Sequence, residues 1–136
     1  MMTPSKKLYY AVEAVVYIAY NAKARPVSSR EIARQQGLPP RYLEQILQKL
    51  VHGGVLKGVR GPGGGYMPVD MATSLKCICG LINDEPPIET LPPTTSIGDS
   101  IIKPLWQSLN ETLEDVLQGV TIADLCRRAE DSGINS

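Results

Sequence analysis

The reactive side chains in this sequence are few, namely three cysteines and one histidine in 136 residues. Cys77 and Cys79 lie two residues apart, which on a helix directs them to different sides and suits neither a shared metal nor a mutual disulfide. Cys126 shares a predicted apolar helix face with Ile122 and Leu125. Free cysteines are commonly small buried hydrophobes, so we predict structural thiols and no metal site.

A thiol sensor is the alternative interpretation of Cys77, Cys79 and Cys126. Thiolates are the reactive form, and they are favoured at helix N-termini and beside cations. Cys77 stands at the start of a predicted short helix and follows Lys76, which makes it the better candidate. A disulfide between Cys77 and Cys126, or between subunits, stays open because a sequence gives no distances.

The sequence contains no set of residues that would support catalysis. His52 is the only histidine, no Ser-His-Asp arrangement is present, and Glu13 and Glu44 are lone carboxylates without a partner at a meaningful spacing. His52 falls at the end of a predicted helix, where capping or a phosphate contact is expected. We therefore predict that the protein is not an enzyme.

The first half of the chain predicts three helices. Ser5 caps a helix to about Ala22, with a buried stripe of Leu8, Ala11, Val12, Val15, Val16 and Ala19. Ser28 to Glu31 fits a capping box before a short helix that ends at Gly37. Pro39-Pro40 then starts a helix from Arg41 to His52, ended by Gly53-Gly54, with a core stripe of Leu43, Ile46, Leu47 and Leu50.

A hairpin follows these helices. Residues 55–59 and 66–69 predict two short strands, joined by the tight connection 61–65, which is rich in glycine. Three helices, the last two joined by a short turn, and then a hairpin form the order of a winged helix-turn-helix. In such a unit the second helix of the pair enters the major groove, which here is the helix over 40–52.

The second half predicts a short helix over 76–83, a proline-rich loop over 84–98 and a long helix from about Ser100 to Gln118. A last helix, capped by Thr121, runs from Ile122 to about Glu130. The long helix carries a wide apolar stripe: Ile101, Ile102, Leu105, Leu109, Leu113, Val116 and Leu117. Either this helix packs back on its own domain or a second subunit covers it, and we expect a two-fold homodimer.

Charge and composition agree with a protein that meets a polyanion. The net charge is zero, but residues 1–70 carry ten basic and four acidic groups, and residues 71–136 carry the reverse. A basic half beside an acidic half favours one face for nucleic acid, although chance clustering gives the same count. No apolar run is long enough for a membrane span, and we expect a cytoplasmic protein with reduced thiols.

Two segments carry a specific resemblance. Residues 42–50, YLEQILQKL, and residues 59–66, VRGPGGGY, together resemble the Rrf2 family of bacterial transcription regulators. Residues 7–12, Glu31-Ile32-Ala33 and Leu105-Trp106 fit as well, so the resemblance covers roughly residues 5–130. It implies a mainly α fold with a small β-hairpin, a winged helix-turn-helix domain plus a long C-terminal dimerisation helix, and double-stranded DNA with a palindromic operator as the partner.

The residues expected to contact DNA lie on the second helix and on the wing. Gln and Glu can read base edges, Arg and Lys suit phosphates, an arginine can enter a narrow minor groove, and glycines let the backbone approach. The candidates are Ser28, Arg41, Tyr42, Glu44, Gln45, Lys49, Lys57, Arg60, Gly61, Gly63, Gly64 and Tyr66. For Tyr42 a packing role is an equal alternative.

The sequence departs from the family at one motif. Many members of the family have three cysteines in the loop before the long helix, and these cysteines bind an iron–sulfur cluster. Here residues 84–99 contain no cysteine, Ser100 stands where the last one would fall, and Lys103 replaces a histidine of some members. Since such clusters need thiolates, we expect no cofactor.

Three units are therefore predicted: a DNA-binding domain over 1–70, a linker or sensor region over 71–98, and a dimerisation helix with a C-terminal helix over 99–136. We expect a dimeric, sequence-specific transcription regulator, a repressor. The alternatives are a winged-helix protein-interaction module and a thiol-based redox-sensing regulator.

Overall fold

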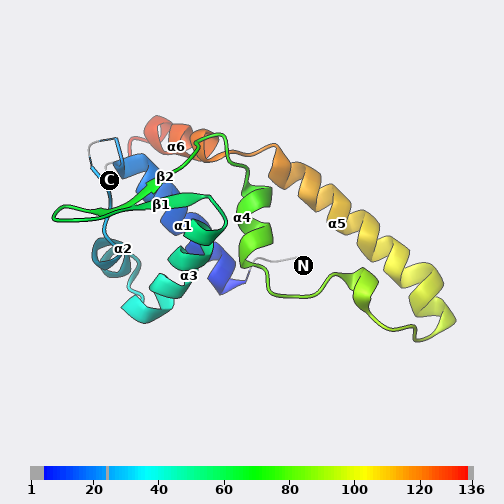
Figure 1. Ribbon diagram of the computed structural model, residues 1–136. Coiled ribbons are helices and arrows are strands. Elements are labelled where there is room, and N and C mark those ends of the chain that lie inside the picture. The colour runs from blue at the N-terminus through cyan, green and yellow to red at the C-terminus, as the bar shows by residue number, and fades with distance from the viewer. Residues whose placement is uncertain (1–4, 24, 135–136) are drawn as a thin grey trace.

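The computed structural model describes residues 5–23 and 25–134. The elements follow one another as α1 (Lys6–Asn21), α2 (Ser29–Gln36), α3 (Pro40–His52), β1 (Leu56–Val59), β2 (Gly65–Pro68), α4 (Leu75–Ile82), η1 (Ile88–Thr90), η2 (Gly98–Ile102), α5 (Lys103–Gln118) and α6 (Ile122–Asp131). The fold is thus mainly helical with one two-stranded antiparallel sheet, as expected (Figure 1). No helix in these described ranges is both long and apolar enough to cross a membrane.

The helix ends obey local capping chemistry. The Ser5 hydroxyl accepts the Leu8 amide at 3.1 Å, and Pro40 occupies the first turn of α3, where its missing N–H costs nothing. Gly37 adopts the left-handed conformation, with a φ of 67°, that closes α2. Thr121 and Asp124 cap each other's backbone at the start of α6. These boundaries confirm the predicted helices within a residue or two.

Only one of the two hydrogen bonds of the capping box predicted at α2 is present. The Ser28 hydroxyl accepts the Glu31 amide at 3.2 Å, but the Glu31 carboxylate does not turn back to cap. It pairs with Arg25 at 2.9 Å and accepts the Tyr17 hydroxyl at 2.8 Å. The carboxylate therefore ties α2 to α1, because two stronger partners from other segments outcompete the backbone amide.

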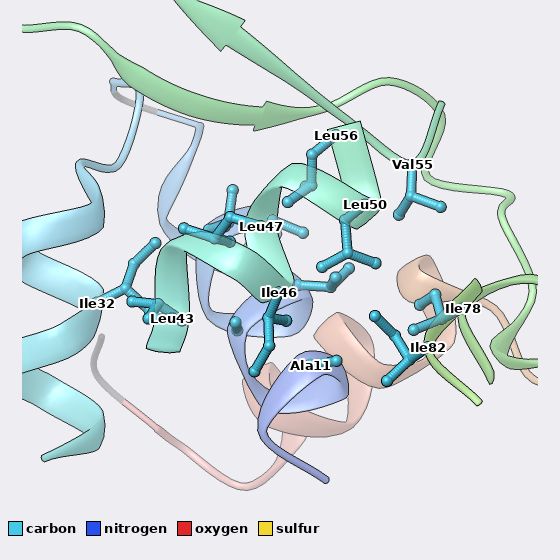
Figure 2. Packing of buried hydrophobic residues seen from close by; sticks show 14 of the residues in the cluster. Ala11, Ile32, Leu43, Ile46, Leu47, Leu50, Val55, Leu56, Ile78 and Ile82 are labelled. Carbon is cyan, nitrogen blue, oxygen red and sulfur yellow. The ribbon is translucent and has the colours of Figure 1, made fainter. Parts of the chain in front are cut away.

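The core forms where the apolar stripes of the helices meet. Figure 2 shows Leu43, Ile46, Leu47 and Leu50 of α3 pointing into one cluster with residues from α1, α2, α4 and the start of β1. All four are fully buried, as their spacing predicted. Removing methylene groups from such a position costs about 2–5 kcal/mol, so this stripe fixes how α3 lies on the domain.

The same core extends beyond the first half of the chain. Ile78 and Ile82 of α4, and Ile122 and Cys126 of α6, are buried in it, and α6 lies against α1 (Figure 1). The Tyr20 hydroxyl donates to the Ile134 carbonyl at 2.5 Å and reinforces that contact. Helix α6 therefore packs with the first half of the chain, against α1.

Helix α5 stands apart from this body. It leaves the other helices at an angle, and among the elements of residues 5–23 and 25–134 its main contacts are with α4, η1 and η2 (Figure 1). None of its residues is buried, and Leu105, Trp106, Leu109 and Val116 are exposed, as is Ile101 in the preceding η2. Among the described residues, α4 therefore covers only part of α5, and most of its apolar stripe is exposed to solvent.

Candidate nucleic-acid interface

The side of α3 opposite its buried stripe is a continuous polar face. Arg41, Gln45, Gln48 and His52 recur every three to four residues, point away from the core and are exposed. Glu44 is exposed on one flank of this face. Amides, a guanidinium and an imidazole in one row supply donors and acceptors for base edges and phosphates.

Gln48 of this face is not among the candidate contacts named from the sequence, and His52 was expected there only as a helix cap or a phosphate contact. Gln45, Gln48 and His52 line the same open groove of about 720 Å³, so they lie side by side on the surface. Their signal was present in the sequence, because positions 45, 48 and 52 follow the helical period. Once Gln45 is placed outward, Gln48 must also point outward.

The wing packs against α3 through Tyr66. This half-buried side chain contacts the core and borders a surface hollow with Gln48, Val51 and His52. Burial raises the pKa of the Tyr66 hydroxyl, and the nearby carboxylate of Glu44 raises it further. The hydroxyl therefore stays protonated and able to donate, and the ring holds the wing beside the polar face.

The wing turn needs its glycines for its own shape. Gly61 and Gly63 adopt φ values of +97° and +74°, which side chains rarely tolerate. A Cβ on Gly64 would lie 2.1 Å from the Val59 carbonyl oxygen. The geometry explains these three glycines without DNA, so a close approach to the sugar-phosphate backbone remains a prediction.

The basic residues of the wing are open to solvent. Lys57 is exposed on β1, where strand alternation directs it away from the buried Leu56. Arg60 is exposed directly after β1, at the start of the turn. Both side chains are therefore accessible, and their contact with a phosphate or a groove remains a prediction.

Lys49 is the predicted phosphate contact that already has a partner. Its ammonium pairs with Asp84 at 2.9 Å, and Lys7 pairs with the same carboxylate at 3.0 Å. Hydrogen bonds from Lys49 and Lys7 hold the pKa of Asp84 below its usual value, and Asp84 raises that of Lys49. The Asp84 carboxylate and the Lys49 ammonium therefore remain charged near neutral pH.

Ser28 and Tyr42 lie at the edge of this surface in structural roles. The Ser28 hydroxyl is engaged as the α2 cap. The Tyr42 ring is half-buried, packs against the core and meets the Tyr10 ring edge to face at 6.4 Å. Tyr42 therefore has the packing role, which was one of the two roles left open for it.

The three cysteines differ in exposure. Cys77 is exposed, Cys79 is half-buried and Cys126 is buried in the core. Burial raises the pKa of the Cys79 and Cys126 thiols, which disfavours the reactive thiolate at both. Only Cys77 keeps the accessibility that a thiol sensor needs.

The loop before α5 does not fit the family's cluster. Its Lys103 ammonium donates to the Leu91 carbonyl at 3.1 Å and pairs with Asp99 at 3.3 Å, and Asp99 accepts the Thr94 amide. An ammonium and carboxylate network offers no thiolate to iron. Within residues 5–23 and 25–134, no three His, Cys, Asp or Glu side chains gather to hold a metal ion.

Comparison with known proteins places this geometry in a family. The chain matches the family model Rrf2, described as an iron-dependent transcriptional regulator, over residues 4–128. It is 30% identical to the HTH-type transcriptional regulator IscR of Escherichia coli K12, an alignment that spans 95% of this chain and 83% of IscR.

Two solved structures share the fold. IscR of T. potens superposes with a TM-score of 0.79 and 29% identity, covering 99% of this chain and 93% of that one. CymR of B. subtilis, titled its global cysteine regulator, gives 0.76 and 26%, covering 94% and 98%. The chain therefore belongs to the Rrf2 family and is a winged helix-turn-helix DNA-binding transcription regulator, not an enzyme.

Proposed function

We propose that this protein is a homodimeric repressor that binds a palindromic operator. The observation that carries the proposal is the exposed polar face of α3 beside the wing. In the proposed complex Gln45 and Gln48 meet base edges in the major groove, Arg41 meets phosphate, and Arg60 enters the minor groove. A regulator of this kind meets its DNA in the cytoplasm, which agrees with its free thiols.

The exposed apolar stripe of α5 supports the dimer. Its exposed stripe includes Leu105, Trp106 and Leu109, and contiguous exposed apolar side chains of this size mark an interface. A two-fold axis through paired α5 helices sets two α3 helices apart for the two half-sites of a palindrome. Repression follows when the bound dimer covers the promoter.

We further propose that the protein acts without an iron–sulfur cluster. The Lys103 and Asp99 network supports this, because it orders the loop with groups that iron does not prefer. The signal that changes DNA binding is then something other than the loss or damage of an iron–sulfur cluster.

The test is fluorescence anisotropy with a duplex from upstream of the protein's own gene and a scrambled duplex. We expect tight binding to the upstream duplex and weak binding to the scrambled one. Gln45→Ala should reduce the preference between the duplexes by about 1–3 kcal/mol per reading head, since it removes a base contact. Arg41→Ala should weaken binding to both duplexes equally and reduce the salt dependence of the affinity.

Matched controls separate these effects from general damage. Gln118→Ala removes an exposed glutamine of α5, and Arg128→Ala removes an exposed arginine of α6. Neither should change either affinity at moderate salt. Equal, weak binding of the wild-type protein to both duplexes would contradict specific recognition of that site.

A further inference from the structure

Asp84 joins two lysines that come from separate helices. Its Oδ1 accepts Lys49 of α3 at 2.9 Å, and its Oδ2 accepts Lys7 of α1 at 3.0 Å. Each carboxylate oxygen thus holds one ammonium, as two oxygens of a phosphate group would. The Asp84 side chain is 65% exposed and the lysines are about a third exposed, so solutes can reach all three groups.

This triad borders the candidate DNA surface. Lys7, Lys49 and Asp84 line the same open groove as Gln45, Gln48 and His52. A duplex whose major groove receives the α3 face brings its sugar-phosphate strands to the flanks of that helix. Lys49 lies on one flank of α3, and Lys7 stands beside it.

We propose that the Asp84 carboxylate occupies the position beside Lys7 and Lys49 that a DNA phosphate takes in the complex. DNA then displaces Asp84 on binding. The inference rests on the proposed function and extends its contact surface to Lys7. The free protein is thereby held in a lower-affinity form, because binding must break two ion pairs before the lysines meet phosphate. Asp84 acts as an intramolecular competitor of DNA.

The position of Asp84 connects this competition to the loop before α5. Asp84 lies two residues after the end of α4, whose Leu81 packs closely on Gly53 at the end of α3. The loop that begins there reaches α5, where Lys103 holds its far end through the Leu91 carbonyl. A movement of that loop therefore withdraws or restores the competitor without reshaping α3.

The experiment measures the affinity of the intact protein for the upstream and scrambled duplexes across a salt series. Asp84→Asn should tighten binding to both by about 3- to 10-fold at low salt, as expected for two exposed ion pairs. The slope of log affinity against log salt should steepen by about one, because in the wild-type protein added salt also weakens the Asp84 ion pairs that DNA must break.

Glu85→Gln is the matched control, because it removes the same charge one residue away. Glu85 is exposed and has no ion pair among the residues that the structure describes. It should change affinity less than about two-fold, as expected for a screened charge without a partner. In a Lys7→Met, Lys49→Met background, Asp84→Asn should have no larger effect than Glu85→Gln.

The possible outcomes separate this inference from the proposed function. Equal effects of Asp84→Asn and Glu85→Gln, in a protein that binds its duplex, would overturn the competition and leave the proposed function standing. A gain from Asp84→Asn that persists in the lysine double variant would overturn it as well. A wild-type protein that binds neither duplex overturns both proposals. Circular dichroism checks that each variant remains folded.

Discussion

The backbones of Val27 and Tyr66 exchange two hydrogen bonds across 39 positions of sequence. The Val27 amide donates to the Tyr66 carbonyl at 3.1 Å, and the Tyr66 amide donates to the Val27 carbonyl at 2.8 Å. An isolated two-stranded hairpin is marginally stable. Because Val27 directly precedes the cap of α2, this pairing fixes the wing relative to both helices of the helix-turn-helix.

Gly65 is expected to be the residue that permits this pairing. A Cβ there would lie 2.4 Å from the Val27 carbonyl oxygen, so Gly65→Ala must push the wing away. We expect a loss of about 1–3 kcal/mol in the free energy of unfolding, measured by urea denaturation. Gly58→Ala is the control, since its Cβ meets nothing within 4 Å, and it should change stability by less than about 1 kcal/mol. Equal losses would contradict the steric argument.

Glu31 should make stability depend on acid. The hydrogen bond from Arg25, followed by that from Tyr17, holds the Glu31 pKa below its ordinary value of 4.5. A carboxyl group with a lowered folded-state pKa stabilises the fold above its unfolded pKa, and that contribution is lost as pH falls through the folded pKa. Glu31→Gln should cost about 1.5 kcal/mol near neutral pH, the lower end of the range for a hydrogen bond to a charged group.

The measurement is the free energy of unfolding of both proteins at a series of pH values. The difference between wild type and Glu31→Gln should shrink as pH drops below 4.5. Glu85→Gln, which removes an exposed carboxylate, should retain the acid-dependent loss of the wild type. A constant offset at every pH would show that the Glu31 charge contributes nothing.

The apolar stripe of α5 should hold two chains together. Leu109→Glu places a charge in the middle of that stripe and should convert a dimer to a monomer in sedimentation experiments, because an unpaired charge is costly to bury. Trp106, the single tryptophan of the chain, is 40% exposed in one subunit and reports on this interface. Its fluorescence should shift to the red when the dimer dissociates.

Gln118→Glu is the matched change on the opposite side of α5, and it should leave the dimer intact. If wild type, Leu109→Glu and Gln118→Glu all sediment as monomers, the proposed dimer is wrong. If all three stay dimeric, another surface forms the contact.

Cys77 should be the first thiol to react. It is exposed, whereas Cys79 and Cys126 are shielded by burial that also raises their pKa. Alkylation with iodoacetamide, followed by mass spectrometry, should show one fast site that Cys77→Ser removes. Equal rates at Cys77 and Cys126 would contradict the burial seen here.

The effect of that alkylation on DNA binding decides between the two interpretations of the cysteines. Unchanged affinity favours structural thiols. A loss of affinity that Cys77→Ser abolishes favours a thiol sensor.

Much of the local structure was predictable from the sequence. The period of Leu43, Ile46, Leu47 and Leu50 predicted the buried side of α3, and the family motifs predicted the winged helix-turn-helix fold. Ser5 and Gly37 predicted helix ends, because capping depends on residues within one turn of each other. The polar face of α3 follows from the same period, and extending the period would also have included Gln48.

Other features depended on residues that only the fold brings together. Glu31 had a local capping role by its spacing, but Arg25 and Tyr17 took its carboxylate. Lys49 is a residue type that suits a phosphate contact, but its ammonium already pairs with Asp84, 35 positions later in the chain. The docking of α6 on α1 likewise followed no spacing rule.

The physical reason is the range of the interactions. Helical periods, caps and turns are set by groups a few residues apart, whose distances the backbone geometry fixes in advance. Pairings such as Val27 with Tyr66, or Lys49 with Asp84, depend on how the apolar stripes pack, and packing is decided by all of them at once. The sequence by itself therefore determined the elements and the family, and the tertiary structure decided which charged and polar groups remain free to meet DNA.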